Sequence, residues 1–486
     1  MSMAARLGLA LGAVVLAVAA VAGVRTALWS PPVVVAKGLD LAPAPDFDLD
    51  AAARRLSHAI TFRTVSHQDS AENDLSQWEG LHAWLQQAYP AAHAAMERQV
   101  IAGHTLVFTW PGRDGDLAPI VLMAHQDVVP ADEADWTHPP FGGVVADGAV
   151  WGRGAVDDKG SLIGLMEAAE ALARSGFQPR RKVMLVFGHD EEVEGTGAQA
   201  AAALLRARGQ TAQFVLDEGL LVVADNPLTG GPAALIGVAE KGYATLVVTA
   251  RGEGGHSSSP PPQTSVGTLA QAVAAITDNP FPMRLQGPGA DMLAVLGAQG
   301  GLPLRAALAN TWATGPLLID QMAATPSGAA LLHTTIAPTM LEGADKENVL
   351  PRQARAWINY RIAPGDSAAT VMARAEQSVG NLPVSLAWAG TPQEPSPVSS
   401  TTSEAWQVIA ALAADVSGAP LAPGLLVGGT DSRFLAEVTA DTYRFQPITL
   451  TMAETAMIHG VDERMTLTNL ERMISFYGRL IATAAR

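Results

Sequence analysis

The chain of 486 residues is long enough for about two to four domains with large buried cores. Its 31 lysines and arginines stand against 47 aspartates and glutamates, and the formal net charge of -16 argues against a nucleic-acid partner bound through phosphates. Because the chain contains no cysteine, disulfides and thiolate metal ligands are excluded, so a transition-metal site must be built from histidine and carboxylates.

The first residues predict a membrane-directed helix. Arg6 precedes an uncharged run at 7–24, and Arg25 follows it. At about 1.5 Å per residue this run nearly crosses a hydrocarbon core of about 30 Å, whereas a cleaved signal usually has a shorter apolar region. We therefore expect a signal anchor at 1–29, with a cleaved signal peptide or a buried helix as the alternatives. The stretch 30–48 is then a linker to a body outside the cytoplasm, either periplasmic or extracellular.

Helical and strand-like stretches alternate between residues 49 and 240. This order predicts an α/β sheet whose central strands are largely parallel. In such open sheets, ligands collect beyond the carboxyl ends of the strands. The expected strands of this segment are 105–110, 119–125, 182–187 and a run that begins at 214.

A second unit is predicted at 241–391. Its order is strand, helix, strand, strand, helix, strand, which matches a ferredoxin-like α+β sandwich, and a long apolar excursion at 279–332 interrupts it. Helical patterns and short strands return at 392–486. We therefore expect one domain made of segments 49–240 and 392–486, with the smaller α+β unit inserted between them.

Two pairs of polar residues directly follow predicted strands. His125 and Asp127 are two residues apart, so they lie on the same side of an extended chain. This is the pattern of a metal ligand and the carboxylate that orients it, with an ordinary surface pair as the alternative. Glu191 and Glu192 are adjacent, so they point to opposite sides. One of them could hold a cation while the other moves a proton.

Further acidic residues occur at comparable places. Asp157 and Asp158 precede a predicted helix, where a helix N-cap is the alternative. A dinucleotide-binding fingerprint fails there, because Asp157 stands where the third glycine is required. Asp217 and Glu218 follow another apolar run, and buried carboxylates of this kind converge only around a positive charge. His459, taken alone, is more typical of a structural histidine.

Eight short motifs together resemble the co-catalytic zinc peptidase family that includes aminoacylase-1, carboxypeptidase S and glutamate carboxypeptidase. The similarity is closest to carboxypeptidase S and to the secreted N-fatty-acyl-amino-acid hydrolases. The motifs run in order from His125 to Arg464, and they are "HQDVVP", "WGRGAVDDKG", "GHDEEVEGTGA", "VLDEG", "GGHSSSP", "KENVLP", "GGTDSR" and "IHGVDERM".

The resemblance implies a zinc-exopeptidase catalytic domain with an inserted lid or dimerisation domain. It also implies two Zn²⁺ ions per chain, for which Co²⁺ or Mn²⁺ could substitute. His125 and Asp217 would hold one ion, and Glu192 and His459 the other. Asp157 would bridge both ions, and the peptide bond that follows it would be cis.

Several other roles are implied by the same resemblance. Glu191 would be the general base, Asp127 would orient His125, and His256 would stabilise the oxyanion. In dimeric members this last histidine comes from the partner subunit, so the resemblance leaves two states open, a homodimer through the inserted domain and a monomer. The expected substrate-binding residues are Asn348 and Arg361, which match carboxylate-holding positions, and Gly428, Gly429 and Thr430, which match a pocket lining. A solvated strand-edge charge is the alternative for Arg361.

The expected reaction is hydrolysis of a peptide or N-acyl amide bond next to a free carboxylate, on a small peptide or an N-acyl amino acid. An aminopeptidase of the same fold would instead need a carboxylate that recognises a free amino terminus. A non-catalytic binding protein would lack a ligand or the base. The excursion at 279–332 is interpreted as packing or an oligomer contact, or alternatively as a channel for an acyl chain.

Overall fold

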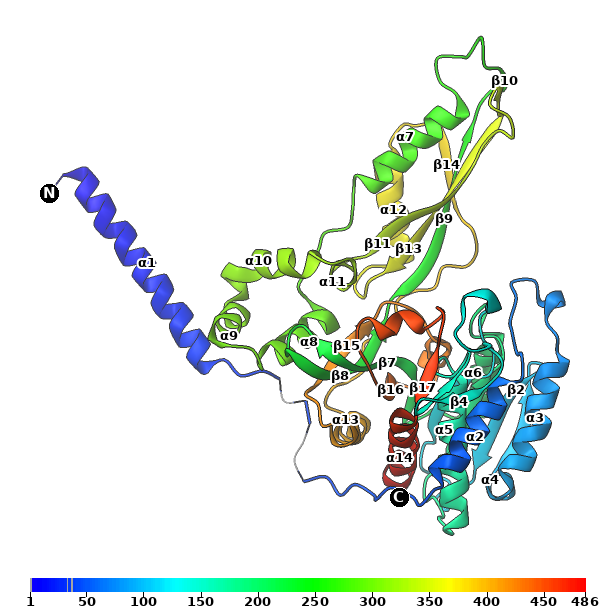
Figure 1. The fold of residues 1–486 in the computed structure, drawn as a ribbon. Helices are drawn as coiled ribbons and strands as arrows, with labels where there is room; N and C mark the ends of the chain where they lie inside the picture. The colour runs from blue at the N-terminus through cyan, green and yellow to red at the C-terminus, as the bar shows by residue number, and fades with distance from the viewer. Residues whose placement is uncertain (1, 33, 36–37) are drawn as a thin grey trace. The chain divides into compact units, whose positions relative to one another are not determined.

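The computed structural model describes residues 2–32, 34–35 and 38–486. Residues 33, 36 and 37 of the predicted linker lie outside the described residues. The chain forms two compact units, which are both drawn in Figure 1. The larger unit consists of Pro32–Val238, Val398–Gly424 and Thr430–Arg486, and the smaller unit consists of Met1–Pro31, Ala239–Pro397 and Leu425–Gly429.

An eight-stranded sheet in the order β1-β2-β6-β3-β7-β16-β8-β15 forms the centre of the larger unit. The strands β3 (Ile120–His125) and β6 (Val183–Gly188) are parallel, and β7 (Phe214–Asn226) is parallel to both β3 and β16 (Thr442–Leu450). Every residue of β3 and β6 is buried, which explains their continuous apolar runs. The prediction that the central strands are largely parallel is confirmed.

Antiparallel strands complete the sheets of this unit. In the main sheet, β2 pairs antiparallel with both β1 and β6, and β8 pairs antiparallel with both β7 and β16. The bounds are β1 (Glu97–Ile101), β2 (Thr105–Trp110), β8 (Gly231–Glu240) and β15 (Leu421–Leu426). A separate three-stranded sheet has the order β17 (Arg464–Thr466), β5 (Ala149–Trp151) and β4 (Val144–Ala146).

Helices cover both faces of the main sheet. Alternate residues of β3 face opposite ways, since Leu122 belongs to the core beneath α5 (Lys159–Arg174) and α14 (Leu467–Ala484), whereas Met123 packs in the core with α6 (Thr196–Ala207). The helix α5 is almost wholly buried and contacts α14. The other helices are α2 (Leu49–Ile60), α3 (Ser76–Ala88), α4 (Pro90–Ala95) and α13 (Glu404–Ser417).

The smaller unit contains an antiparallel sheet in the order β11-β13-β9-β14, the strand order of a ferredoxin-like sandwich. Its core packs one face of this sheet against α7 and α12. A two-stranded pair, β10 and β12, extends from it. The bounds are β9 (Gly242–Arg251), β10 (Gly255–His256), α7 (Ser265–Thr277), β11 (Thr335–Glu342), β12 (Val349–Leu350), β13 (Gln353–Ile362), α12 (Ala368–Val379) and β14 (Val384–Trp388). The predicted α+β element order is confirmed.

The apolar excursion folds into four helices, although no regular element was predicted there. They are α8 (Gly287–Gly297), α9 (Leu302–Ala309), α10 (Thr311–Ala323) and α11 (Pro326–Ala330). Three of them carry proline in the first turn, where its missing N–H costs no hydrogen bond. Glycine, proline and alanine are frequent in this segment and interrupt the pattern of large apolar residues. The helices therefore could not be recognised from hydrophobic periodicity.

The N-terminal run forms the helix α1 (Met3–Leu28). Its segment Leu9–Leu28 has a mean hydropathy of 2.1 and is long and apolar enough to cross a membrane. None of its residues is fully buried, and Ala22 and Thr26 are half-buried. The chain therefore carries an N-terminal apolar helix of membrane-spanning length.

Candidate metal centre

The ends and turns of the central parallel strands bring the predicted site residues of the larger unit together. His125 is the last residue of β3, and Glu191 and Glu192 lie in the turn between β6 and α6. Asp217 and Glu218 lie within β7, where the pairing with β16 shifts register. Because β3, β6 and β7 are neighbours in the sheet, their side chains converge from distant parts of the sequence.

The carboxylate of Asp157 lies between two imidazoles. Its Oδ1 is 2.9 Å from Nε2 of His125, and its Oδ2 is 3.0 Å from Nε2 of His459. The same Nε2 of His459 is 3.0 Å from Oε2 of Glu192. Asp157 precedes Asp158, the N-cap residue of α5, and the peptide bond between the two is cis, as the resemblance implied. One carboxylate thus joins both histidines of the predicted ligand set.

Glu218, rather than its neighbour Asp217, faces this cluster. Oε1 of Glu218 is 3.7 Å from Nε2 of His125. The carboxylate of Asp217 instead accepts the backbone N–H of Ser432 at 2.8 Å and that of Glu218 at 3.0 Å. The potential ligand atoms of His125, Asp158 and Glu218 lie within 4.8 Å of one another, as do those of a second group, which is His125, Asp157 and Glu192.

Asp127 holds the loop that carries both glutamates. Its Oδ1 accepts the backbone N–H of Glu191, and its Oδ2 accepts that of Glu192, both at 3.1 Å. Oδ2 also accepts the hydroxyl of Ser66 at 2.7 Å, and Oδ1 lies 3.4 Å from Nδ1 of His125. The side chain is fully buried, so these contacts fix the position of the base candidate as well as that of a ligand.

Glu463 was not singled out from the sequence, although it lies within the last motif. Its carboxylate is fully buried and accepts the backbone N–H groups of Val156 at 2.8 Å and Asp157 at 3.0 Å. It also accepts the N–H of Gly154 at 3.1 Å and pairs with Arg153 at 2.7 Å. Glu463 therefore holds the turn that presents Asp157.

Asp158 occupies the N-cap position of α5, but no N–H of that helix is capped by its side chain among the described contacts. Its Oδ1 instead accepts a hydrogen bond from Nε2 of Gln446 at 2.9 Å. Its Oδ2 lies 3.4 Å from the backbone N–H of His125. The helix-cap interpretation of this acidic pair therefore does not account for either carboxylate.

Burial and mutual repulsion shift the pKa values of the acidic groups. Burial raises the pKa of Glu191 well above its usual value, and it raises the pKa of Glu218 to about 8, with a further contribution from Asp157. Hydrogen bonds that His459 donates to the carboxylates of Asp157 and Glu192 raise the pKa of His459 to about 10. Crowded carboxylates of this kind attract positive charge.

The residues fit a divalent metal. Oε1 of Glu192 is buried and has no hydrogen-bond partner among the residues that the structure describes, which leaves it free to coordinate an ion. Imidazole nitrogens and carboxylate oxygens without any thiolate are ligands that suit Zn²⁺, Co²⁺ or Mn²⁺. A divalent cation could therefore take the place of the protons that these histidines and carboxylates share.

The remaining predicted residues are distributed as follows. In the smaller unit, His256 of β10 pairs with Val349 of β12. Asn348 directly precedes Val349, and its carbonyl accepts the N–H of Ser257 at 3.2 Å. Arg361 stacks over the ring of Tyr243 at 4.8 Å. Gly428 and Gly429 end the smaller unit's last segment, and Thr430, which begins a segment of the larger unit, is buried against the hydroxyl of Ser432 at 2.6 Å.

Comparison with known proteins defines the class. The profile of peptidase family M20/M25/M40 matches residues 121–483, which is more than half of the chain. The chain is a metallohydrolase. It belongs to peptidase family M20/M25/M40, and the resemblance seen in the sequence is confirmed.

Curated relatives are similar along most of their length. The chain is 35% identical to "Probable carboxypeptidase S-like 2" of Dictyostelium discoideum, with 88% of this chain and 84% of the relative covered. It is 34% identical to the human "N-fatty-acyl-amino acid synthase/hydrolase PM20D1", with 89% and 88% covered. Both relatives are therefore compared over nearly the whole chain.

Solved structures share the fold at low identity. A metallo-carboxypeptidase of this family from Sulfolobus solfataricus, Sso-CP2, has a TM-score of 0.64 at 15% identity and covers 88% of this chain and 98% of its own. Human carnosine dipeptidase 1 has a TM-score of 0.62 at 12% identity, with 90% and 96% covered. These similarities confirm the α/β fold.

Proposed function

We propose that the chain hydrolyses a peptide or N-acyl amide bond next to a free carboxylate, with two Zn²⁺ ions per chain. The observation that carries the proposal is the position of Asp157 between the imidazoles of His125 and His459. A carboxylate that reaches both imidazoles through different oxygens is suited to bridge two ions. His125, Asp157, Glu192 and His459 are four of the proposed ligands.

For the fifth ligand we propose Glu218 in place of Asp217. Both oxygens of Asp217 already accept backbone N–H groups, whereas Glu218 directs an oxygen toward His125. Asp217 would then position its neighbour rather than bind the ion itself. The sequence alone could not separate these adjacent carboxylates.

Bound ions of this kind would polarise the scissile carbonyl and lower the pKa of an attacking water. Glu191 accepts a proton from that water and delivers it to the departing nitrogen as the C–N bond breaks. The hydrogen bond from the backbone N–H of Glu191 to Asp127 fixes the main chain from which the carboxylate of Glu191 extends. Asp127 also keeps the imidazole of His125 in position.

The remaining predicted residues, all but Thr430 in the smaller unit, are proposed to act on the substrate. His256 would stabilise the oxyanion, and Asn348 and Arg361 would hold the substrate's carboxylate, with Gly429 and Thr430 in the pocket lining. What supports this is the match of these positions to family motifs, together with the adjacency of His256 in β10 and Asn348, which directly precedes β12.

The substrate class is proposed from the relatives. One is named as a carboxypeptidase S-like protein and another as a synthase and hydrolase of N-fatty-acyl amino acids. We infer that the substrates are small peptides or N-acyl amino acids. A long acyl chain would require an apolar channel, for which the helices α8–α11 of the excursion are the candidate.

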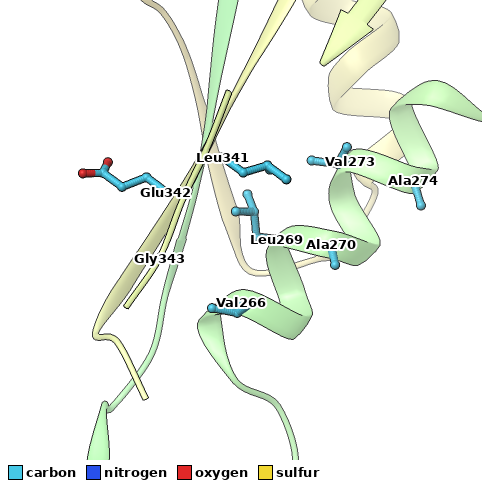
Figure 2. A pocket seen from close by; sticks show the side chains of 8 residues that line it. All are labelled: Val266, Leu269, Ala270, Val273, Ala274, Leu341, Glu342 and Gly343. Atoms are coloured by element: carbon cyan, nitrogen blue, oxygen red, sulfur yellow. The ribbon is translucent and has the colours of Figure 1, made fainter. Parts of the chain in front are cut away.

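We further propose that the smaller unit forms a homodimer. A groove of about 410 Å³ lies between α7 and the edge strand β11, and Figure 2 shows the side chains of Leu341, Leu269 and Val273 directed toward it. Leu341 is 72% exposed and Met340 is 58% exposed. An exposed apolar edge strand can pair with a strand of another chain, and a second copy of this chain would cover it.

The apolar helix α1 is proposed as an uncleaved signal anchor that holds the catalytic body outside the cytoplasm. Its support is the length and hydropathy of Leu9–Leu28, which has no acidic or basic residue before Arg25. The alternative, a secreted protein with a cleaved leader, would show a new N-terminus. N-terminal sequencing of the protein purified from its host separates the two.

A substrate screen tests the proposed function. Full-length protein is stripped with a chelator, reloaded with Zn²⁺ and tested on N-lauroyl and N-acetyl amino acids and on dipeptides, each with a free and an amidated carboxyl group. We expect hydrolysis only with metal and only of free carboxylates. Equal cleavage of the amidated substrates would contradict the proposal and would favour an aminopeptidase. Turnover that is independent of acyl length would exclude the channel.

A further inference from the structure

The C-terminal part of α1 docks on the corner between α9 and α10. Nε of Arg25 donates a hydrogen bond to the carbonyl of Ala309 at 3.1 Å. The side-chain amide of Asn310 donates to Oγ1 of Thr26 at 3.1 Å and to the carbonyl of Ala22 at 3.3 Å. Asn310 is only 4% exposed, so this is a packed polar contact and not a loose one.

Because α1 is long enough to cross a membrane, the position of this contact along α1 gives the depth of the contact in that membrane. The apolar segment ends at Leu28, and the contact extends back to Ala22. At about 1.5 Å per residue, the corner therefore reaches back about 9 Å from the end of the segment. Helices that lie in a membrane interface are buried by about 5–10 Å, which is the same depth.

The outer surface of the corner is apolar. In the first turns of α10, Trp312 is 56% exposed and Leu317 is 58% exposed. Ala313 and Pro316 share this exposed face, because residues four apart on a helix are neighbours. Leu302, at the start of α9, is 70% exposed.

Charge and side-chain type also suit an interface. Arg305 is the one charged residue in the sequence 302–317, and the polar residues Asp320 and Gln321 continue the same face of α10 one turn later. Nε1 of Trp312 donates to Oδ1 of Asn310 at 3.3 Å, so its polar end is satisfied while its ring stays exposed. Tryptophan is enriched at this depth of a bilayer.

We propose that residues 302–317, the α9–α10 corner, lie in the outer interface of the phospholipid bilayer that α1 crosses. The inference rests on the proposed signal anchor. The smaller unit is then held at the membrane surface by two elements, α1 and the corner docked on it. An acyl substrate that partitions into the bilayer would meet this unit at the lipid surface.

Because the chain has no cysteine, single cysteines can report on this contact in the full-length protein. Leu317→Cys and Trp312→Cys probe the corner, Ala17→Cys probes the middle of α1, and Asp345→Cys is an exposed control near β12. Each variant carries an environment-sensitive fluorophore and is reconstituted in phosphatidylcholine and phosphatidylglycerol vesicles. Lipids with a nitroxide near the head group or deep in the acyl chain then quench the label.

We expect the shallow nitroxide to quench the labels at 312 and 317 several-fold more than the label at 345, and the deep nitroxide to quench the label at 17. Quenching at 17 without quenching at 312 or 317 would overturn the inference and leave the anchor intact. No quenching at any position would overturn both. A blue-shifted label at 317 that neither lipid quenches would show that protein covers this face, and it would also overturn the inference.

Discussion

The buried carboxylate of Glu463 accepts a hydrogen bond from the backbone N–H of Asp157 at 3.0 Å. It also holds the N–H groups of Gly154 and Val156 and pairs with Arg153. Every atom that faces Glu463 in these contacts is a donor. The residue thus acts on the metal centre through the turn that carries Asp157, without being a ligand itself.

Glu463→Gln should weaken metal binding. The new amide would place an NH₂ group against these donors, so the turn would lose order. We expect a loss of about 10–100-fold in Zn²⁺ affinity and about 1–3 kcal/mol of stability in the metal-free chain. Zinc titration calorimetry and thermal unfolding measure the two effects. The exposed Glu471→Gln on α14 is the control, and equal behaviour of the two variants would contradict the role.

Glu218→Gln and Asp217→Asn should separate the fifth ligand from its neighbour. Removing the charge of Glu218 is expected to lower the bound zinc from two ions per chain toward one, because its oxygen faces His125. Asp217→Asn should keep both ions at saturating zinc while lowering stability, since its contacts are backbone N–H groups. Metal analysis after gel filtration gives the counts. The opposite pattern would restore Asp217 as the ligand.

The strand ends that carry the site could be predicted from the sequence, because buried parallel strands give continuous apolar runs and polar residues follow them directly. The contact between Glu463 and Asp157 could not, because 306 residues separate the two. The choice between Asp217 and Glu218 depends on a register shift within β7, which no local pattern reveals. The helices of the excursion were missed because proline and small residues obscure their periodicity.

His82 should contribute to acid sensitivity. Its ring is 6% exposed, and burial lowers its pKa from 6.5 to about 4, while Nε2 contacts Oε1 of Gln126 at 2.6 Å. Between pH 6.5 and pH 4 the unfolded chain binds the proton more readily, so stability falls as the pH falls through this window. The loss is on the order of 1–3 kcal/mol.

The variant His82→Gln tests this assignment. Its unfolding free energy, measured by urea denaturation of the metal-free chain, should fall less steeply than that of the wild type from pH 6.5 to pH 4. Above pH 7 the two curves should run parallel. A parallel course through the acid window as well would show that another group carries the effect.

Leu341→Glu should dissociate the proposed homodimer. The substitution places a charge in the groove between α7 and β11, and a buried unpaired charge opposes association. Light scattering after size exclusion should then report the mass of one chain in detergent. Leu75→Glu, at an exposed leucine before α3, is the control. An unchanged mass for Leu341→Glu would remove this surface from the dimer.

The central claim is that Glu192 and its partners hold a pair of ions while Glu191 moves the proton. Counting zinc per chain and measuring turnover in Glu191→Gln tests both parts, with the exposed Glu194→Gln as the control. We predict two ions retained and turnover reduced by about 10²–10⁴-fold. Fewer than two ions in the saturated wild type, or near-normal turnover in Glu191→Gln, would contradict the account.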